Sequence, residues 1–317
     1  MAMQDTSTPT ARSDAGPKRA PGVWSRFWQN DAPGYLFLLP WLIGFLGLTI
    51  GPMLTSLYLS FTDFDLLTSP DWVGAANYIR MFENDPKFWT SMRVTIFFVI
   101  FSVPLKLAFA LAVAMLLNRG IRGLPLYRAL FYLPSLLGAS VAIAILWRQI
   151  FAGNGLINQL LAMVGIVGPS WISNPQYSLW TLIVLSIWQF GSPMIIFLAG
   201  LRQIPTDMYE AASLDGASKW RQFVKITLPL LTPVVFFNAI IQTIEAFKSF
   251  TPAFIISGGT GNPINSTLFY TLYLYQEAFG FFRMGYASAL AWVLLALVGL
   301  FTAFSFFTSK YWVHYDE

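Results

Sequence analysis

The sequence predicts an all-α protein that crosses a membrane six times, and composition and hydropathy carry this prediction. Of the 317 residues, 56% are hydrophobic and only 11% are charged, whereas a soluble domain carries about 25% charged residues. The mean hydropathy is +0.59. Six runs reach the roughly 20 mostly apolar residues that a membrane-spanning helix needs. Together these observations exclude a disordered chain, a coiled coil and most soluble enzymes.

The six expected spans follow from the apolar runs in chain order. The first occupies an interval without a charged residue, and the second is interrupted by Pro104 and Lys106. The fifth carries Glu245 and Lys248. A further apolar stretch, 155–168, is too short to span and is expected to lie at the interface or to re-enter the membrane. The expected spans are 35–61, 94–118, 129–151, 177–201, 230–257 and 286–308.

The placement of lysine and arginine predicts the orientation. Of the 19 basic residues, 12 lie in the two tails, the second-to-third loop and the fourth-to-fifth loop, and five lie in the opposite loops. Because basic loops stay in the cytoplasm, both termini are predicted to be cytoplasmic. The expected domains are a flexible tail over 1–34 with an interfacial segment near Trp24–Trp28, a transmembrane domain over 35–308 and a short tail over 309–317.

Several kinds of chemistry are excluded by residues that the chain lacks. It has no cysteine, and its one histidine is His314, near the C-terminus. A disulfide, a thiolate metal site and a His-based triad in the bundle are therefore excluded. No G-x-x-x-x-G-K-[ST] segment is present, so nucleotide phosphates cannot be bound by that loop. We expect no catalytic residue, no metal site and no nucleic-acid partner.

The longest cytoplasmic loop, 202–229, predicts two helices separated by a glycine. Acidic residues such as Glu210 fall in the first turn of the first helix and complement its positive end. Gly216 interrupts the helical pattern, and a second, basic stretch follows over 217–226. Pro229 is expected to end this stretch before the fifth span. The element lies outside the bilayer and is amphipathic enough to dock on a partner.

The residues of this loop resemble the EAA loop of bacterial ABC importer permeases. The matching positions are Glu210-Ala211-Ala212, Gly216, Ile226 and Leu228-Pro229. The similarity covers roughly 35–312, because 126–134, the glycine-rich 258–261 and the Gly-Tyr-Ala-Ser-Ala run at 285–289 also resemble carbohydrate permeases. The chain is most similar to the first permease of the maltose/glycerol-phosphate, multiple-sugar type, which implies a type I ABC importer permease fold.

This resemblance implies partners and a mechanism. It implies a heterodimer with a second, homologous permease, two copies of an ATPase that hold ATP and Mg²⁺, and a periplasmic or lipid-anchored solute-binding protein. The sugar would cross the cytoplasmic membrane by alternating access, without catalysis or a cofactor on this chain. The ATPase-coupling contacts that the resemblance implies are Glu210, Ala211, Ala212, Asp215 and Gly216.

A polar stripe in the fifth span predicts a lining for the substrate path. Four polar residues follow one another at spacings of 4, 3 and 4, which places them on one helix face. Ionisable groups within a membrane tend to face a cavity or a partner. Interhelical hydrogen bonds and a local Glu245–Lys248 ion pair remain alternatives. The candidate path residues are Asn238, Gln242, Glu245, Lys248 and Ser249, with Trp188 and Gln189 from the fourth span.

Other functions remain open at this point. A stand-alone secondary transporter or channel would use Glu245 and Lys248 for ion coupling, although no inverted repeat is evident. A membrane-embedded enzyme would have to use Asp63 and Asp65, which are weak evidence on one loop. Lysines at 106 and 248 with Arg148 leave open an acidic sugar, although Lys106 is expected to snorkel or to pair with a carboxylate on a neighbouring helix.

Overall fold

The computed structural model of the chain describes residues 32–120, 123–138 and 140–314. It contains two compact units, 1–55 and 56–317, and each is described by itself. The expected interfacial segment near Trp24–Trp28 and the last three residues lie outside the described part of the chain. Of the described residues, four helices are long and apolar enough to cross a membrane, or six spans if each bent helix pair is one.

The first unit is an apolar helical stretch. It consists of α2 (Ala32–Phe45), a π-turn η2 (Leu46–Ile50) and the start of α3 (Gly51–Leu59), which runs on into the second unit. An 18-residue window within the 25-residue segment Tyr35–Leu59 has a mean hydropathy of 1.8, and the segment extends about 38 Å as a helix. Phe37 and Leu48 are more than 80% exposed within the unit. This segment matches the first expected span.

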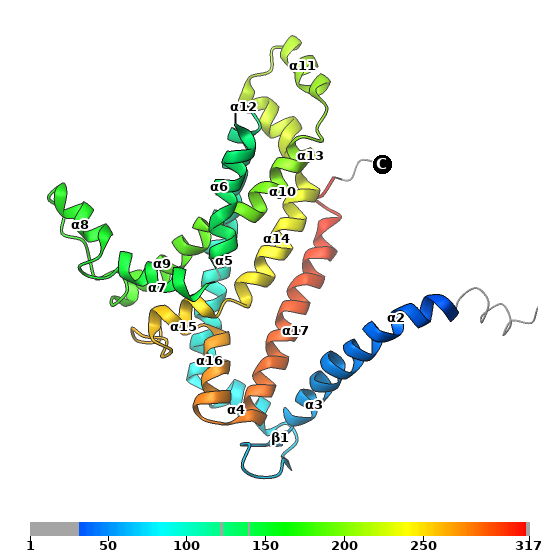
Figure 1. Cartoon of the computed structure of the whole chain (residues 1–317), viewed down its shortest axis with the longest axis vertical. Coiled ribbons are helices and arrows are strands. Elements are labelled where there is room, and N and C mark those ends of the chain that lie inside the picture. The colour runs from blue at the N-terminus through cyan, green and yellow to red at the C-terminus, as the bar shows by residue number, and fades with distance from the viewer. Residues whose placement is uncertain (1–31, 121–122, 139, 315–317) are drawn as a thin grey trace, which may run out of the picture. The chain divides into compact units, whose positions relative to one another are not determined.

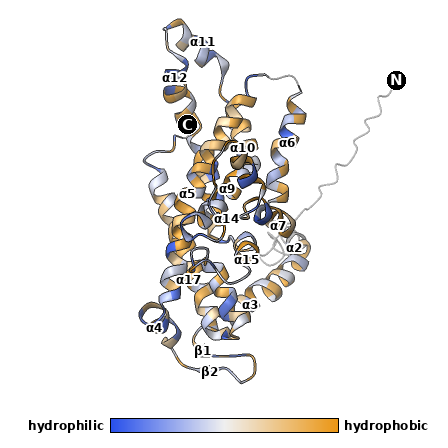
Figure 2. Ribbon diagram, turned by 90° about the vertical axis from the view of Figure 1, so that its left-hand side faces the viewer, coloured by the Kyte–Doolittle hydropathy of each residue, from blue (hydrophilic) through white to orange (hydrophobic). Residues whose placement is uncertain are grey.

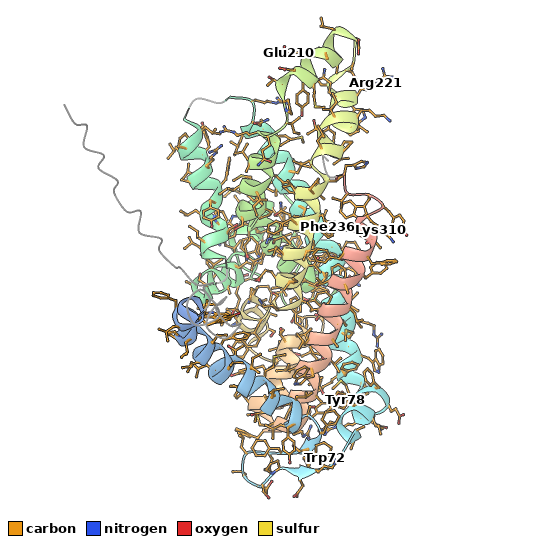
Figure 3. All side chains as sticks on the ribbon, turned by 90° about the vertical axis from the view of Figure 1, so that its right-hand side faces the viewer. Trp72, Tyr78, Glu210, Arg221, Phe236 and Lys310 are labelled. Atoms are coloured by element: carbon orange, nitrogen blue, oxygen red, sulfur yellow. The ribbon has the colours of Figure 1, made fainter. Side chains whose placement is uncertain are left out.

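The second unit begins with a small cap at the end of the bundle. Strands β1 (Thr62–Asp63) and β2 (Asp71–Trp72) pair antiparallel, and α4 (Ala76–Glu83) follows. Figure 3 shows Trp72 and Tyr78 at this end, opposite Glu210. In the hairpin loop, Asp65 accepts hydrogen bonds from Thr68 and Leu67, which lower its pKa. Asp65 therefore stabilises the turn of this hairpin loop.

Helix α5 (Pro86–Leu117) is the central element of the second unit. Asp85 caps it by accepting hydrogen bonds from the backbone N–H groups of Lys87 and Phe88, at 3.0 and 3.1 Å. The second oxygen of Asp85 accepts hydrogen bonds from the hydroxyls of Tyr273 and Tyr286. Burial raises the pKa of Tyr273, so its phenol stays protonated as a donor.

The structure corrects the expected second span, because α5 begins eight residues earlier than expected, and it runs through Pro104 without a break. Proline removes one hydrogen bond from a helix and its ring crowds the carbonyl four residues earlier, and the long packed face of α5 compensates for this cost. α5 packs against α9 (Pro175–Trp188), α10 (Gly191–Leu201), α14 (Thr232–Phe247) and α16 (Tyr270–Tyr275).

The third and fourth expected spans are each two helices rather than one. α6 (Leu124–Leu137) and α7 (Val141–Ile150) meet at 95°, and α9 and α10 meet at 43°. The expected third span, 129–151, therefore falls on a bent helix pair and not on a single helix. The physical reason is local, since the hydroxyl of Ser140 accepts a hydrogen bond from the Ile143 N–H and starts a new helix. The expected interfacial stretch contains α8 (Leu156–Met163), a helix too short to span.

The remaining elements complete the bundle. The fifth span stops at Phe247 and restarts as α15 (Thr251–Ser257), and the sixth is α17 (Met284–Ser309), preceded by the π-turn η4 (Gln276–Gly280). The backbone N–H of His314 donates to the Thr232 hydroxyl at 2.9 Å, so α17 ends beside the start of α14. Figure 2 shows apolar residues predominating along α10 and α6, whereas α4 is largely hydrophilic.

The cytoplasmic loop folds as α11 (Thr206–Leu214), α12 (Lys219–Gln222), the π-turn η3 (Phe223–Thr227) and α13 (Leu228–Leu230). Figure 1 shows α11 and α12 beyond the end of the bundle, at the same end as the last turns of α17. The predicted helix–glycine–helix arrangement is confirmed. The expected helix end at Pro229 was wrong, since Pro229 is tolerated after a π-turn and the chain turns only at Leu231.

Candidate functional site

The second unit contains a partly open cavity of about 480 Å³, with polar and apolar lining residues, between α5, α6, α9, α14 and the helix breaks. Five of the residues singled out by the sequence line it, namely Gln189, Gln242, Glu245, Lys248 and Ser249. The cavity thus brings together part of the fifth-span stripe and one residue of the fourth span. Its other polar lining residues are Lys106, Ser135, Ser186, Ser192 and Thr251.

Two of the candidate path residues lie elsewhere. Asn238 is fully buried, and neither polar atom of its amide has a hydrogen-bond partner among the described residues. It is one helical turn before Gln242 on α14, which packs against both α5 and α10. Trp188 packs on Trp147, with ring centroids 5.9 Å apart, and does not line the cavity. Helical periodicity placed these residues on one face but could not show how far the cavity extends along it.

The charged residues of the cavity are unevenly paired. The ammonium of Lys248 lies 3.2 Å from the carboxylate of Glu245, and these side chains are 59% and 62% exposed. Lys106 lines the same cavity and has no carboxylate within 4 Å among the described residues, although Glu245 on α14 acts on it electrostatically. Arg148 is exposed and away from the lining. The local ion pair expected from the sequence is therefore present, and Lys106 is the excess cation.

One wall of the cavity is built where the two helix breaks meet. The hydroxyl of Ser135 donates to the backbone carbonyl of Gln189 at 2.9 Å and accepts the backbone N–H of Ser192 at 3.0 Å. The side-chain amide of Gln189 donates to the Gly138 carbonyl at 3.1 Å. Backbone groups freed by both bends are thus satisfied by side chains, as a membrane interior requires.

The close packing of this wall requires glycine at positions 138 and 191. A Cβ on Gly191 would lie 2.5 Å from the Phe131 carbonyl oxygen and 2.7 Å from the Tyr132 Cα. A Cβ on Gly138 would lie 2.3 Å from the Gln189 side chain. The sequence gives no signal for Ser135 and Ser192, because their partners are more than 50 residues away.

A second candidate site is the cytoplasmic helix pair. Gly216 has φ +74°, and the Ala217 and Gly216 N–H groups donate to the Ala212 and Ser213 carbonyls, at 2.9 and 3.1 Å. This is a Schellman motif, and its left-handed position favours glycine. Glu210, Ala211, Asp215 and Gly216 are exposed and Ala212 is half-buried, so the residues implied as coupling contacts form an accessible surface. Figure 3 shows Glu210 and Arg221 at this tip.

Two hydrogen bonds between side chains that the sequence did not single out brace the pair. The amide of Gln222, which is buried, donates to the Ser213 hydroxyl at 2.8 Å and so joins α12 to α11. The hydroxyls of Tyr209 and Thr227 are 2.9 Å apart. In contrast, Leu214 is 90% exposed and Trp220 72% exposed. A braced element with exposed apolar side chains beyond the bundle is suited to bind another protein.

Comparisons with known proteins agree with this architecture. Residues 86–311 match the family described as "Binding-protein-dependent transport system inner membrane component". The probable ABC transporter permease protein YesP of Bacillus subtilis (strain 168) is 55% identical over 290 residues, covering 91% of this chain and 94% of the relative. The lactose transport system permease protein LacF of Rhizobium radiobacter is 32% identical, covering 88% and 95%.

A solved structure has the same fold. It is a bacterial alginate ABC transporter in complex with an alginate pentasaccharide-bound periplasmic protein, and the match has a TM-score of 0.74 at 20% identity, covering 91% of this chain and 97% of that chain. The predicted all-α, type I importer permease fold is thereby confirmed, as is the expected location in the inner membrane. The chain therefore belongs to the binding-protein-dependent transport system inner membrane components, as the permease of an ABC importer.

Proposed function

We propose that this permease moves a sugar or oligosaccharide inward by alternating access, as one half of a heterodimer. The observation that carries the proposal is the polar cavity among the spanning helices. Most of its polar lining consists of neutral hydroxyl and amide groups, such as Gln189, Gln242 and Ser249, and these groups suit hydrogen bonding to sugar hydroxyls. The lactose permease and alginate importer to which the chain is similar support a carbohydrate.

The cavity also refines which candidate residues contact the solute. Gln189, Gln242, Glu245, Lys248 and Ser249 border the open volume. We assign the buried Asn238 and the stacked Trp188 to contacts between helices, and not to the solute. The exposed Glu245–Lys248 pair stays available to bind hydroxyl groups from the cavity wall.

The helix pair is proposed to couple the bundle to an ATPase. Two ATPase copies would bind ATP and Mg²⁺, a solute-binding protein would deliver the sugar, and this chain would itself be non-catalytic. Ala211 and Ala212 present little side chain and permit close approach, while Glu210 and Asp215 can pair with basic residues of the partner. Leu214 supplies apolar area, as its exposure indicates.

The test compares alanine substitutions at two glycines that both have a positive φ. Gly216 and Gly74 have φ +74° and +61°, and open space surrounds the position of a Cβ at each. Alanine therefore costs about 1–2 kcal/mol of local strain at either position. Gly74 lies in the cap, at the opposite end of the unit from α11. The complex is purified by affinity from its own host with each variant, and ATP-driven sugar uptake is measured in proteoliposomes.

We expect Gly216→Ala to reduce ATPase recovery or ATP-driven uptake at least fivefold, and Gly74→Ala to leave both close to the unsubstituted protein. Equal behaviour of the two variants would remove the coupling role of the helix pair. Recovery of the chain without any ATPase from the unsubstituted protein would contradict the importer itself and favour a stand-alone transporter.

A further inference from the structure

We propose that the cavity selects an anionic sugar and that Lys106 binds its carboxylate or phosphate group. This inference deepens the proposed sugar import and rests on it.

Among the described residues, Lys106 has no carboxylate within ion-pair distance, although Glu245 acts on it electrostatically. Three charged residues line the cavity, namely Lys106, Glu245 and Lys248. Glu245 is engaged by Lys248 at 3.2 Å, and among the described residues no other Asp or Glu borders the volume. One carboxylate therefore faces two ammonium groups. The cavity has a net charge of about +1 that a solute anion can neutralise.

The position of Lys106 in the membrane raises the free-energy cost of leaving this excess charge without a counter-charge. Lys106 lies 11 residues before the end of the 32-residue α5, which is about 17 Å along the helix axis. The helix exceeds the roughly 30 Å of a bilayer core, and Lys106 lies well inside its length. A cation at such depth is costly and tends to face a cavity or a counter-charge. Lys106 faces the cavity, as the lining shows.

The neutral lining identifies the rest of the ligand. The side-chain amides of Gln189 and Gln242 and the hydroxyls of Ser186 and Ser249 border the same volume as the ammonium. A small inorganic anion would leave most of these groups unused. A uronate or a sugar phosphate presents hydroxyls to the amides and one charged group to Lys106, where a charge-assisted hydrogen bond is stronger than a neutral one.

The experiment uses the complete complex, with its co-purified permease, ATPase and solute-binding protein, in ATP-loaded proteoliposomes. The probes are short oligouronates prepared from alginate and pectin, the same oligosaccharides after reduction of every carboxyl group, and hexose phosphates. Vesicle contents are quantified by mass spectrometry. The variants are Lys106→Met, Lys106→Arg and the matched Lys248→Met, which removes a lysine from the same cavity. The effect of each variant is judged on one probe at a time, so the preference of the binding protein cancels in the comparison between variants.

We expect the unsubstituted complex to import an anionic probe at least tenfold faster than the reduced oligosaccharides. Lys106→Met should lower that rate at least tenfold, Lys106→Arg should retain most of it, and Lys248→Met should have a smaller effect. Import of the oligouronates or of the hexose phosphates shows whether the charged group of the solute is a carboxylate or a phosphate.

Three outcomes would overturn the proposal. The first is equal import of the reduced and the charged probes. The second is an equal effect of Lys106→Met on the import of both kinds of probe. This second outcome would make Lys106 a structural partner of a carboxylate in the second permease. In both cases the importer stands. The third is ATP-dependent uptake of none of the charged probes, which would overturn the inference and leave import of a neutral sugar standing.

Discussion

Replacing Gly191 by alanine should disrupt the packing between the α6–α7 break and the α9–α10 break. The added Cβ would lie 2.5 Å from the Phe131 carbonyl oxygen and 2.7 Å from the Tyr132 Cα. Both are backbone atoms, so neither can rotate away. α10 must then move off α6, which overpacking data place at about 1–3 kcal/mol. The movement also stretches the Ser135 hydrogen bonds at 2.9 and 3.0 Å, each worth about 1 kcal/mol. The total is about 3–5 kcal/mol.

The matched control is Gly299→Ala in α17. Gly299 has no atom within 4 Å of a Cβ position and has helical neighbours on both sides, so alanine there should be neutral or stabilising by about 1 kcal/mol. Both variants are purified in the complex, and thermal stability is followed by size-exclusion chromatography after heating, beside ATP-driven uptake. Gly191→Ala should lower the midpoint temperature and the uptake. Equal stability and uptake of the two variants would refute the packing argument for the cavity wall.

Two further predictions concern the ends of the bundle. Asp85→Ala removes a helix cap and the acceptor of two tyrosine hydroxyls, and should destabilise the unit by about 3–5 kcal/mol. In the same heating assay the exposed Asp63→Ala should cost less than about 0.5 kcal/mol, and equal midpoints would contradict this. Gln222→Leu removes the bridge to Ser213 and should speed amide hydrogen exchange over 206–222 severalfold without changing the midpoint temperature. Unchanged exchange would show that the bridge does not hold the helix pair together.

Hydropathy located the spans because a membrane fixes the length and polarity of a crossing helix. It could not locate the break between α9 and α10, which involves contacts such as that of Ser135 with Gln189, 54 residues apart. The second span was expected to continue past Pro104, and α5 does so. A sequence shows the local preferences of its residues, whereas the path of a helix also depends on the helices that pack against it.

The candidate sites also combine features that the sequence predicts with features that depend on packing. The Gly216 turn followed from the residue alone, because a left-handed helix end favours glycine. The polar stripe followed from periodicity, but periodicity could not tell the buried Asn238 from Gln242, which borders the cavity. Lys106 was expected to snorkel or to pair, and its place on the cavity wall depends on packing between α5 and α14.

The most direct test of the transport account is the energy source of uptake. Proteoliposomes containing the purified complex are loaded with ATP, with a non-hydrolysable ATP analogue, or with no nucleotide under an imposed proton or sodium gradient. The account predicts sugar accumulation only with ATP and with the solute-binding protein present outside. Accumulation by this chain alone, driven by the ion gradient and independent of ATP, would contradict it.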